Sequence, residues 1–398
     1  MMSENPLNIL VVGAGMYTCG VGTPSFGTIL PTIFEASKIG IVSSVTIAGR
    51  DPEKAIAVEE KIEELSLLMG TRCQTDYIPR AGERDDDAFR KALDNNQFDC
   101  AIVAVPDHLH FEVTKYLLEK RIACLVVKPL VATLRELDIL VDLQKRSQVF
   151  CAVEFHKRYD EANLKMRHLI REGEVGEILY FLVEYSQRKS IPIQHFSGWI
   201  DNTNIFQYLG VHYVDLIHFL TDAVPCRVLA TGQKKFLRSQ GIDNYDSIQA
   251  LIEWDYSEHH PEHGKRFISS IATNWVDSSQ STAMSDQKIK VIGTRGRIES
   301  DQKDRGLSLT SDALGKQDIN PYFSDFQPNV NDTKFQFRGY GFRSIYQFLV
   351  DTSEIVTQKT HPQNLQGIRA TFHNARVSTS VIQAVNQSLA SNNEWIVI

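Results

Sequence analysis

Through its first 153 residues the chain alternates between short apolar runs and longer amphipathic stretches, and this alternation narrows the possible folds most. The apolar runs that predict strands lie near residues 7–12, 44–48, 72–77, 99–105, 122–127 and 149–153. The stretches that predict helices lie near residues 29–37, 52–68, 85–95, 108–120 and 133–146. Strands that alternate with helices in this way build a parallel sheet with helices on both faces. We therefore predict an α/β fold in which residues 1–153 form a doubly wound parallel sheet.

A different pattern begins after about residue 155. Runs that alternate between apolar and polar residues lie near 178–187, 227–235, 247–254, 267–275, 288–292 and 296–299. Helical patterns lie near 160–172, 205–220, 341–356 and 364–389. Period-two alternation is typical of a sheet with one face on a core. We predict that residues 154–398 form a second α/β domain on an open, mainly antiparallel sheet. Because an open sheet usually needs a cover, we expect a homodimer or homotetramer through this sheet.

Composition excludes several classes of function. The chain has 42 Lys and Arg against 49 Asp and Glu, which gives a formal net charge of −7 and argues against binding to nucleic acid or an anionic membrane. No apolar run approaches the roughly 18 residues that a membrane span needs. The six cysteines are scattered without a C-x-x-C pair, which is typical of a reducing cytoplasm. We expect a cytoplasmic protein whose partner is a small molecule.

The first predicted strand ends in a glycine pair, Gly13 and Gly15, which Met16 follows. Glycines after an apolar strand let the backbone turn tightly and approach a pyrophosphate. Thr18 stands in place of the third glycine of the dinucleotide-binding fingerprint, and the loop before the next helix is long. We predict that Gly13, Gly15 and Met16 contact a dinucleotide cofactor. A plain strand-to-helix turn is the alternative.

The second predicted strand ends just before Arg50 and Asp51. At this position an acidic residue binds the ribose 2′-hydroxyl of NAD, whereas an arginine accommodates the 2′-phosphate of NADP. Asp51 precedes Pro52, which is the pattern of a helix N-cap followed by proline, and this leaves Arg50 freer to contact a ligand. We therefore predict NADP as the cofactor, with NAD as the alternative, and place both residues at the cofactor site.

Two further strands deliver polar residues to one edge of the predicted sheet. The strand near 99–105 leads to Pro106 and His110, and the strand near 122–127 leads to Lys128. Ligands of open α/β sheets bind at the carboxyl ends of the strands. An ammonium group there stabilises the alkoxide that forms when a carbinol loses its proton, and its pKa falls readily on burial. We predict that Lys128 is catalytic, with Pro106 and His110 beside the cofactor; a structural lysine at a strand end is the alternative.

Two later segments complete the set of candidate motifs. His156-Lys157-Arg158-Tyr159 follows a predicted strand, and Tyr208-Leu209-Gly210-Val211-His212 lies in a helical pattern. With Val127-Lys128-Pro129 and the Pro106/His110 pair, these segments resemble motifs of the Gfo/Idh/MocA oxidoreductases, the family of glucose–fructose oxidoreductase and inositol dehydrogenase. The resemblance spans nearly the whole chain. Two acids of the family motifs are replaced, the glutamate before the lysine by Val127 and the aspartate of the helix by Tyr208.

The resemblance implies a Rossmann domain followed by an α/β domain with an open sheet. It also implies an NAD(P)-dependent dehydrogenase that moves a hydride between C4 of the nicotinamide and a secondary alcohol of a sugar, cyclitol or sugar-acid derivative. In this family Lys128 would hydrogen-bond the reacting oxygen and His212 would act as general base. Tyr208 and Asp215 lie four residues before and three after His212 on one helix face, so Asp215 can fix the imidazole tautomer. A core histidine and a packing role for Tyr208 are the alternatives.

Basic residues after two of the predicted strands indicate a site for an anionic group of the substrate. Lys157 and Arg158 follow one strand, and Arg188 follows another. Arginine and lysine bind carboxylates and phosphates; solvated strand ends are the alternative. The histidine-rich segment 258–263 lacks the helix-spaced pair typical of metal sites, so we predict a solvated loop and no metal.

Two other functions stay open on the sequence alone. One is a glycosidase of the same fold that holds NAD tightly and oxidises its substrate transiently. The other is a non-catalytic regulator that senses the cofactor, which the replaced motif acids at Val127 and Tyr208 leave open. Cofactor that copurifies without being consumed would favour the first, and tight binding without turnover would favour the second.

Overall fold

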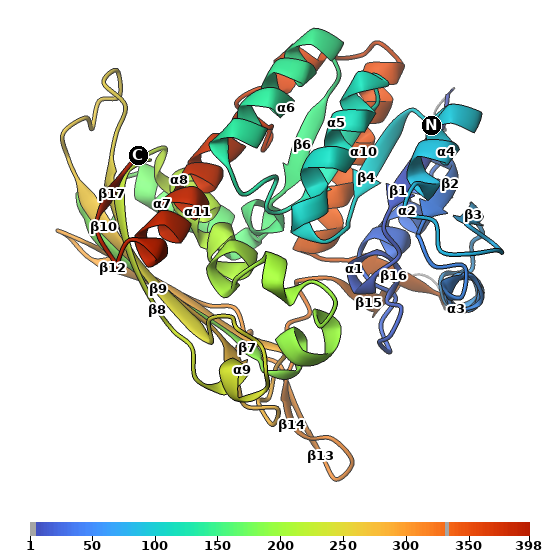
Figure 1. Cartoon of the computed structure of the whole chain (residues 1–398). Helices are drawn as coiled ribbons and strands as arrows, with labels where there is room; N and C mark the ends of the chain where they lie inside the picture. The colour runs from blue at the N-terminus through green and yellow to red at the C-terminus, as the bar shows by residue number, and fades with distance from the viewer. Residues whose placement is uncertain (1–4, 331–333) are drawn as a thin grey trace. The chain divides into compact units, whose positions relative to one another are not determined.

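The computed structural model describes residues 5–330 and 334–398, which divide into two compact units (Figure 1). The first unit contains the chain up to Leu130, together with Arg135–Tyr159 and Tyr322–Asn374. The second contains Val131–Leu134, Asp160–Pro321 and Ala375–Ile398. Each unit is therefore assembled from separate chain segments. Residues 322–374, which our boundary after residue 153 assigned to the second domain, belong to the first unit.

A six-stranded parallel sheet forms the centre of the first unit. Its strands are β1 (Leu7–Val12), β2 (Val42–Ala48), β3 (Gln74–Ile78), β4 (Cys100–Val103), β5 (Ala123–Val127) and β6 (Cys151–Glu154). They lie in the order β3-β2-β1-β4-β5-β6 with parallel pairing throughout, so the predicted doubly wound sheet is confirmed. The order reverses between β1 and β4, and open α/β sheets bind ligands at such a switch point.

Burial explains why these apolar runs become strands. Strand β4 is buried along its whole length and β1 along nearly all of it, as parallel strands with helices on both faces require. The connecting helices are α2 (Ile29–Lys38), α3 (Lys54–Met69), α4 (Ala88–Asn95), α5 (His110–Glu119) and α6 (Leu134–Ser147). These five helices begin and end within a few residues of the predicted ones.

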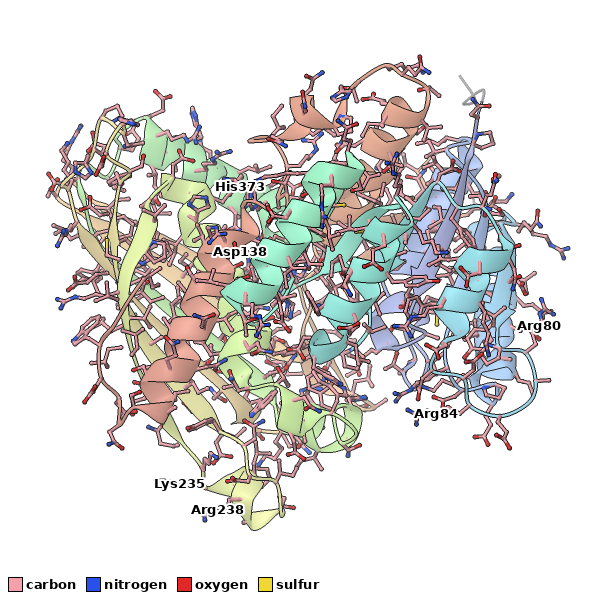
Figure 2. All side chains as sticks on the ribbon, turned by 45° about the horizontal axis from the view of Figure 1, so that its top comes forward. Arg80, Arg84, Asp138, Lys235, Arg238 and His373 are labelled. Carbon is pink, nitrogen blue, oxygen red and sulfur yellow. The ribbon has the colours of Figure 1, made fainter. Side chains whose placement is uncertain are left out.

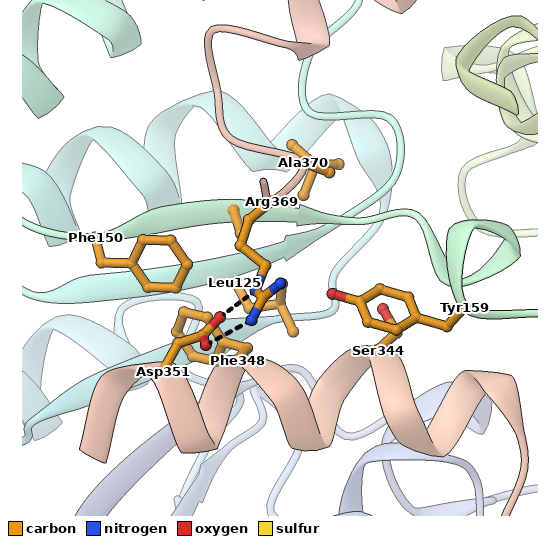
Figure 3. Close-up of a pocket in the computed structure, with 10 residues that line it drawn as sticks. Leu125, Phe150, Tyr159, Ser344, Phe348, Asp351, Arg369 and Ala370 are labelled. Carbon is orange, nitrogen blue, oxygen red and sulfur yellow. Dashed lines mark hydrogen bonds and ion pairs between the residues drawn. The ribbon is translucent and has the colours of Figure 1, made fainter. Parts of the chain in front are cut away.

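The chain returns to the first unit at Tyr322. It forms the hairpin β15 (Asp325–Pro328) and β16 (Phe335–Arg338), the helix α10 (Tyr340–Val356) and the 3-10 turn η6 (Pro362–Leu365). The segment after η6 pairs with β6, since the Val153 N–H donates to the Ala370 carbonyl at 2.7 Å. Arg369, the residue before Ala370, contacts α10: its Nε donates to Asp351 Oδ2 at 2.6 Å, as the close-up in Figure 3 shows.

The helix that we predicted over residues 364–389 is wrong in its first part, because α11 spans Ala375–Ala390. Gly367 adopts φ +80°, a left-handed conformation that interrupts helical backbone and suits glycine. The next residues form the pairing with β6. Tertiary hydrogen bonds therefore override a helical pattern that continues through the local sequence.

A seven-stranded sheet organises the second unit. Its strands are β7 (Ile178–Arg188), β8 (Val224–Gln233), β9 (Ser247–Asp255), β10 (Phe267–Asp277), β11 (Ser285–Gly293), β12 (Arg297–Asp301) and β17 (Ile396–Val397), in the order β12-β11-β7-β10-β9-β8-β17. The pair β7–β10 is parallel, and the other registered pairs are antiparallel. The predicted open, mainly antiparallel sheet is confirmed. Helices α7 (Glu161–Arg171), α8 (Val211–Thr221) and α11 lie beside this sheet (Figure 1).

Two details of the second unit differ from a simple strand-and-helix pattern. The helix predicted over 205–220 begins as a π-helical turn, η5 (Phe206–Gly210), before α8 continues it. A two-stranded hairpin, β13 (Ser308–Ser311) and β14 (Gly315–Asp318), follows β12. Across residues 5–330 and 334–398, no helix has both the length and the apolar character that a membrane crossing requires.

Candidate active site

The glycine turn after β1 has the geometry of a dinucleotide cradle. Gly13 adopts φ +110°, and a Cβ there would lie 2.2 Å from the Ala104 carbonyl oxygen after β4, so only glycine fits this close approach at the switch point. Gly15 begins the short helix α1 (Met16–Cys19), and a Cβ on it would meet no atom within 4 Å. Thr18 donates its hydroxyl to the Gly13 carbonyl at 2.8 Å. These residues fit a bound dinucleotide, with a tight turn beside an open backbone approach.

The end of β2 keeps both candidate specificity residues accessible. The Arg50 side chain is 48% exposed and lies 3.8 Å from carboxylate oxygens of Asp51 and Asp86. Asp51 lies 3.5 Å from the Lys54 ammonium. Helix α3 begins only at Lys54 with Glu53 as its N-cap, so the predicted N-cap role of Asp51 is wrong: a turn separates it from the helix.

One arginine of the loop after β3, Arg84, shares an acidic neighbour with Arg50. Arg84 Nη2 lies 3.1 Å from the same Asp86 carboxylate that Arg50 approaches. Figure 2 shows Arg80 and Arg84 on the segment that follows β3, and both side chains are more than half exposed. The rim beyond β2 therefore carries exposed guanidinium groups next to the position where a cofactor ribose binds.

His110 braces two loops at the carboxyl edge of the sheet. Its Nδ1 lies 2.6 Å from the Pro129 carbonyl oxygen and its Nε2 lies 2.9 Å from that of Val105. The residue is 1% exposed, and burial lowers the pKa of its imidazole. Both ring nitrogens thus contact backbone carbonyls, so the ring joins the loop that Pro106 begins to the residue after Lys128. The predicted contact of this imidazole with the cofactor stays a prediction.

Lys128 lies in a partly buried, acid-flanked position directly after β5. Burial lowers the pKa of Lys128 to about 8, and the negative charges of Asp107 and Glu154 oppose that fall. Asp107 opens the 3-10 turn η1 (Asp107–Leu109) after β4, and Glu154 is the last residue of β6. A lysine with this pKa exchanges protons close to neutral pH, which suits a group that transfers a proton at a reacting oxygen.

Glu154 and His156 lie at this edge of the sheet, and neither was among the site residues that the sequence predicted. Glu154 is 2% exposed, and its Oε2 lies 3.1 Å from Nδ1 of His156. The His156 ring stacks on Tyr340 at 5.7 Å and meets the edge of Phe323 at 5.2 Å. The available signal was an acid at the end of an apolar strand, at the same edge of the sheet as Lys128.

The predicted basic residues differ in their surroundings. Lys157 is 1% exposed, which excludes the alternative of a solvated strand end for this side chain. The Arg158 guanidinium lies 5.8 Å from the centre of the Phe155 ring. Arg188 donates to the Ser281 carbonyl. Lys157 and Arg158 lie in the turn η2 (His156–Tyr159) of the first unit, and Arg188 ends β7 in the second.

The second unit holds His212 in its core. His212 and Asp215 are 3% and 2% exposed on α8, and the His212 ring lies 6.3 Å from the ring of Tyr185 on β7. Tyr208 lies in the π-turn η5, with its ring 4.7 Å from Phe196. The i→i+5 bonds of a π-turn widen the helix and recur at functional sites. Lys128 and His212 thus belong to different units, and their convergence stays a prediction.

Comparisons with known proteins identify the family. Residues 7–155 match the model of an oxidoreductase family with an NAD-binding Rossmann fold, and residues 163–299 match the GFO/IDH/MocA C-terminal domain. The chain belongs to the Gfo/Idh/MocA family. The histidine-rich segment that we predicted as a loop lies in the turn between β9 and β10 of this family's C-terminal domain.

Curated relatives and solved structures agree with this family. Inositol 2-dehydrogenase of Rhizobium meliloti is 21% identical over 296 residues, which is 72% of this chain and 81% of that enzyme. The scyllo-inositol 2-dehydrogenase (NAD(+)) of Bacillus subtilis is 26% identical over 215 residues, 52% of this chain and 56% of that enzyme. The crystal structure of Lactobacillus plantarum myo-inositol 2-dehydrogenase superposes with a TM-score of 0.69 at 17% identity, covering 99% of this chain and 100% of that chain.

One of the similar solved structures also contains ligands. The scyllo-inositol dehydrogenase of Lactobacillus casei, with bound NAD(H) and scyllo-inositol, has a TM-score of 0.66 at 14% identity and covers 99% of both chains. At this identity the likeness establishes the shared fold.

Proposed function

We propose that this chain is an NAD(P)-dependent dehydrogenase that transfers a hydride between C4 of the nicotinamide and a secondary alcohol of a sugar, cyclitol or sugar-acid derivative. The observation that carries the proposal is Lys128. A lysine whose pKa burial lowers to about 8 follows β5 of an NAD-binding Rossmann domain, at the edge where such domains bind ligands. The relatives named as inositol dehydrogenases support the substrate class.

Each proposed residue has one task in the reaction. The backbone at Gly13, Gly15 and Met16 holds the cofactor pyrophosphate at the switch point. When bound there, the nicotinamide would supply the hydride acceptor for the carbinol carbon. Lys128 contacts the reacting oxygen, where its ammonium stabilises developing negative charge and its neutral form accepts a proton. His212, oriented by Asp215, takes this proton on from Lys128 when the two units bring it to the substrate.

The remaining candidate residues bind the substrate in this proposal. Lys157, Arg158 and Arg188 supply cations for a carboxylate or phosphate on the sugar. Tyr208 supplies a hydroxyl in place of the acid that the family motif carries.

We propose NADP as the preferred cofactor, with NAD as the alternative. Arg50 is exposed at the end of β2, and Arg84 shares its Asp86 neighbour, so two guanidinium groups are available for a 2′-phosphate. Asp51 retains a carboxylate for the ribose 2′-hydroxyl of NAD. Binding constants for both cofactors, compared between wild type and an Arg50 variant, test this assignment.

We also propose that the protein is a cytoplasmic homodimer or homotetramer through the outer face of the seven-stranded sheet. Tyr180, Leu182 and Ile268 are 39%, 45% and 38% exposed on neighbouring strands of this face, an apolar surface that a second copy of the same chain would cover. Five of the six cysteines are buried thiols, consistent with a reducing compartment. A monomer in light scattering would refute the oligomer.

The activity test is a panel of polyols and sugar acids with NADP⁺ or NAD⁺, read as the absorbance of reduced nicotinamide. We expect turnover with at least one cyclitol or sugar, and a loss of at least about a hundredfold in kcat/KM for Lys128→Met. Lys115→Met, on the exposed side of α5, is the matched control and should keep activity. No turnover across the panel would contradict the proposal. Cleavage of a glycoside without net reduction of cofactor would favour the glycosidase alternative.

A further inference from the structure

The residue before Lys128 is an apolar valine, yet an acid ends the neighbouring strand. Strands β5 and β6 pair in parallel, and Val127 is in register with Glu154. Their carboxyl ends therefore lie side by side, with Lys128 directly after one strand and Glu154 at the end of the other. Glu154 is 2% exposed, so its carboxylate acts in a weakly screened environment.

The two oxygens of this carboxylate have different surroundings. Oε2 contacts His156 Nδ1 at 3.1 Å. Oε1 is buried and has no hydrogen-bond partner among the residues that the structure describes. A buried carboxylate oxygen without a donor is costly, so its position indicates that a positive charge or a donor close by compensates it.

The titratable groups around Lys128 come from three elements. Glu154 ends β6, Asp107 opens η1, and His110 at the start of α5 contacts the carbonyl of the residue after Lys128. His156 faces Glu154 from the far side. Burial lowers the pKa of Lys128, whereas Asp107 and then Glu154 raise it. The two carboxylates therefore oppose the desolvation of one ammonium group.

We propose that Glu154 is a positioning residue for Lys128, and that it supplies from β6 the negative charge that Val127 cannot supply from β5. Held by His156, the carboxylate stabilises the protonated form of Lys128 and keeps its ammonium directed toward the reacting oxygen. The catalytic consequence rests on the proposed dehydrogenase function, whereas the charge coupling between Glu154 and Lys128 can be measured without any substrate.

The test compares Glu154→Gln with Glu112→Gln, a control on the exposed side of α5, in the full-length protein. The protonation midpoint of Lys128 is measured by trace acetylation at a series of pH values, with mass spectrometry of the Lys128 peptide. Removing an opposing charge at close range should lower this midpoint by about one pH unit, because the ammonium loses part of its stabilisation. The control should leave it unchanged, and Asp107→Asn should lower it further than Glu154→Gln does.

A second readout is the pH dependence of kcat/KM for alcohol oxidation. In Glu154→Gln the ascending limb of this pH profile should move to lower pH together with the acetylation midpoint. Replacing a residue with a purely structural role would not shift the two together. If acetylation shifts but no polyol is oxidised, the dehydrogenase function fails while the positioning role stands.

An unchanged acetylation midpoint in folded Glu154→Gln would overturn the inference. If glutamine prevents folding, Glu154→Asp replaces it, since aspartate keeps the charge but withdraws it by one methylene. That variant should shift the midpoint in the same direction by a smaller amount. The absence of any shift in the folded aspartate variant would also overturn the inference.

Discussion

Replacing Lys128 with methionine should stabilise the protein while it removes activity. The pKa of Lys128 falls from 10.5 to about 8 in the folded chain, with burial as the main cause. One pKa unit corresponds to about 1.4 kcal/mol, so the folded state loses at most about 3 kcal/mol by holding this ammonium at pH 7. Methionine has a similar length and carries no charge, and it therefore avoids the cost.

The stability difference between Lys128→Met and the wild type should decrease as the pH rises. Below the folded pKa both the folded and the unfolded chain carry the proton, and the cost is fully present. Between pH 8 and 10.5 the unfolded chain binds more protons than the folded chain, so the stability of the wild type rises with pH. The advantage of Lys128→Met should therefore fall from about 3 kcal/mol at pH 7 to about 2 at pH 9 and below about 1 at pH 10.

Urea denaturation of both proteins at pH 7 and pH 9 measures the effect, with Lys115→Met as the exposed control, which should change stability by no more than about 0.5 kcal/mol. Thermal midpoints give a second measure, with a rise of roughly 3–8 °C expected at pH 7. The reasoning would be refuted if Lys128→Met were no more stable than the wild type at pH 7, or if its advantage did not depend on pH.

Three further predictions concern the ion pair below the sheet and the cofactor site. Asp351→Asn should destabilise the protein by about 3–5 kcal/mol in urea, because it leaves the Arg369 guanidinium without the carboxylate that it contacts at 2.6 and 3.0 Å; wild-type stability would contradict this. Gly13→Ala places a Cβ 2.2 Å from the Ala104 carbonyl oxygen, so calorimetry should detect at least a tenfold loss of cofactor affinity, or the variant should fail to fold; a folded variant with wild-type affinity would argue against the cradle. Arg50→Gln should weaken NADP binding by about tenfold or more and leave NAD binding unchanged, and equal effects on the two cofactors would count against NADP preference.

The strands of the first unit were predictable because a strand that is buried on both faces consists of consecutive apolar residues, which the sequence shows directly. Leu7–Val12 is an uninterrupted apolar run apart from Asn8, and the observed strand β1 has these bounds. A parallel strand covered on both faces needs such a run. The glycine turn was predictable for a similar reason, since the close approach at Gly13 excludes any side chain.

Features that the sequence did not reveal are set by the register between strands and by contacts between segments that are distant in the sequence. Glu154 lies beside the end of β5 because Val127 and Glu154 share a register across β5 and β6. The last helix begins at Ala375 because residues near Ala370 pair with β6, a contact that no local pattern contains. The contacts of His110 with the Pro129 and Val105 carbonyls also join loops that are separate in the sequence.

The most direct test of the central claim is a crystal structure with NADP⁺ and a polyol that the enzyme oxidises. The account predicts that Lys128 Nζ and the His212 imidazole both lie within hydrogen-bond distance of one substrate hydroxyl, whose carbon faces C4 of the nicotinamide. A complex in which the nicotinamide lies away from Lys128, or in which His212 remains enclosed by protein on all sides, would contradict it.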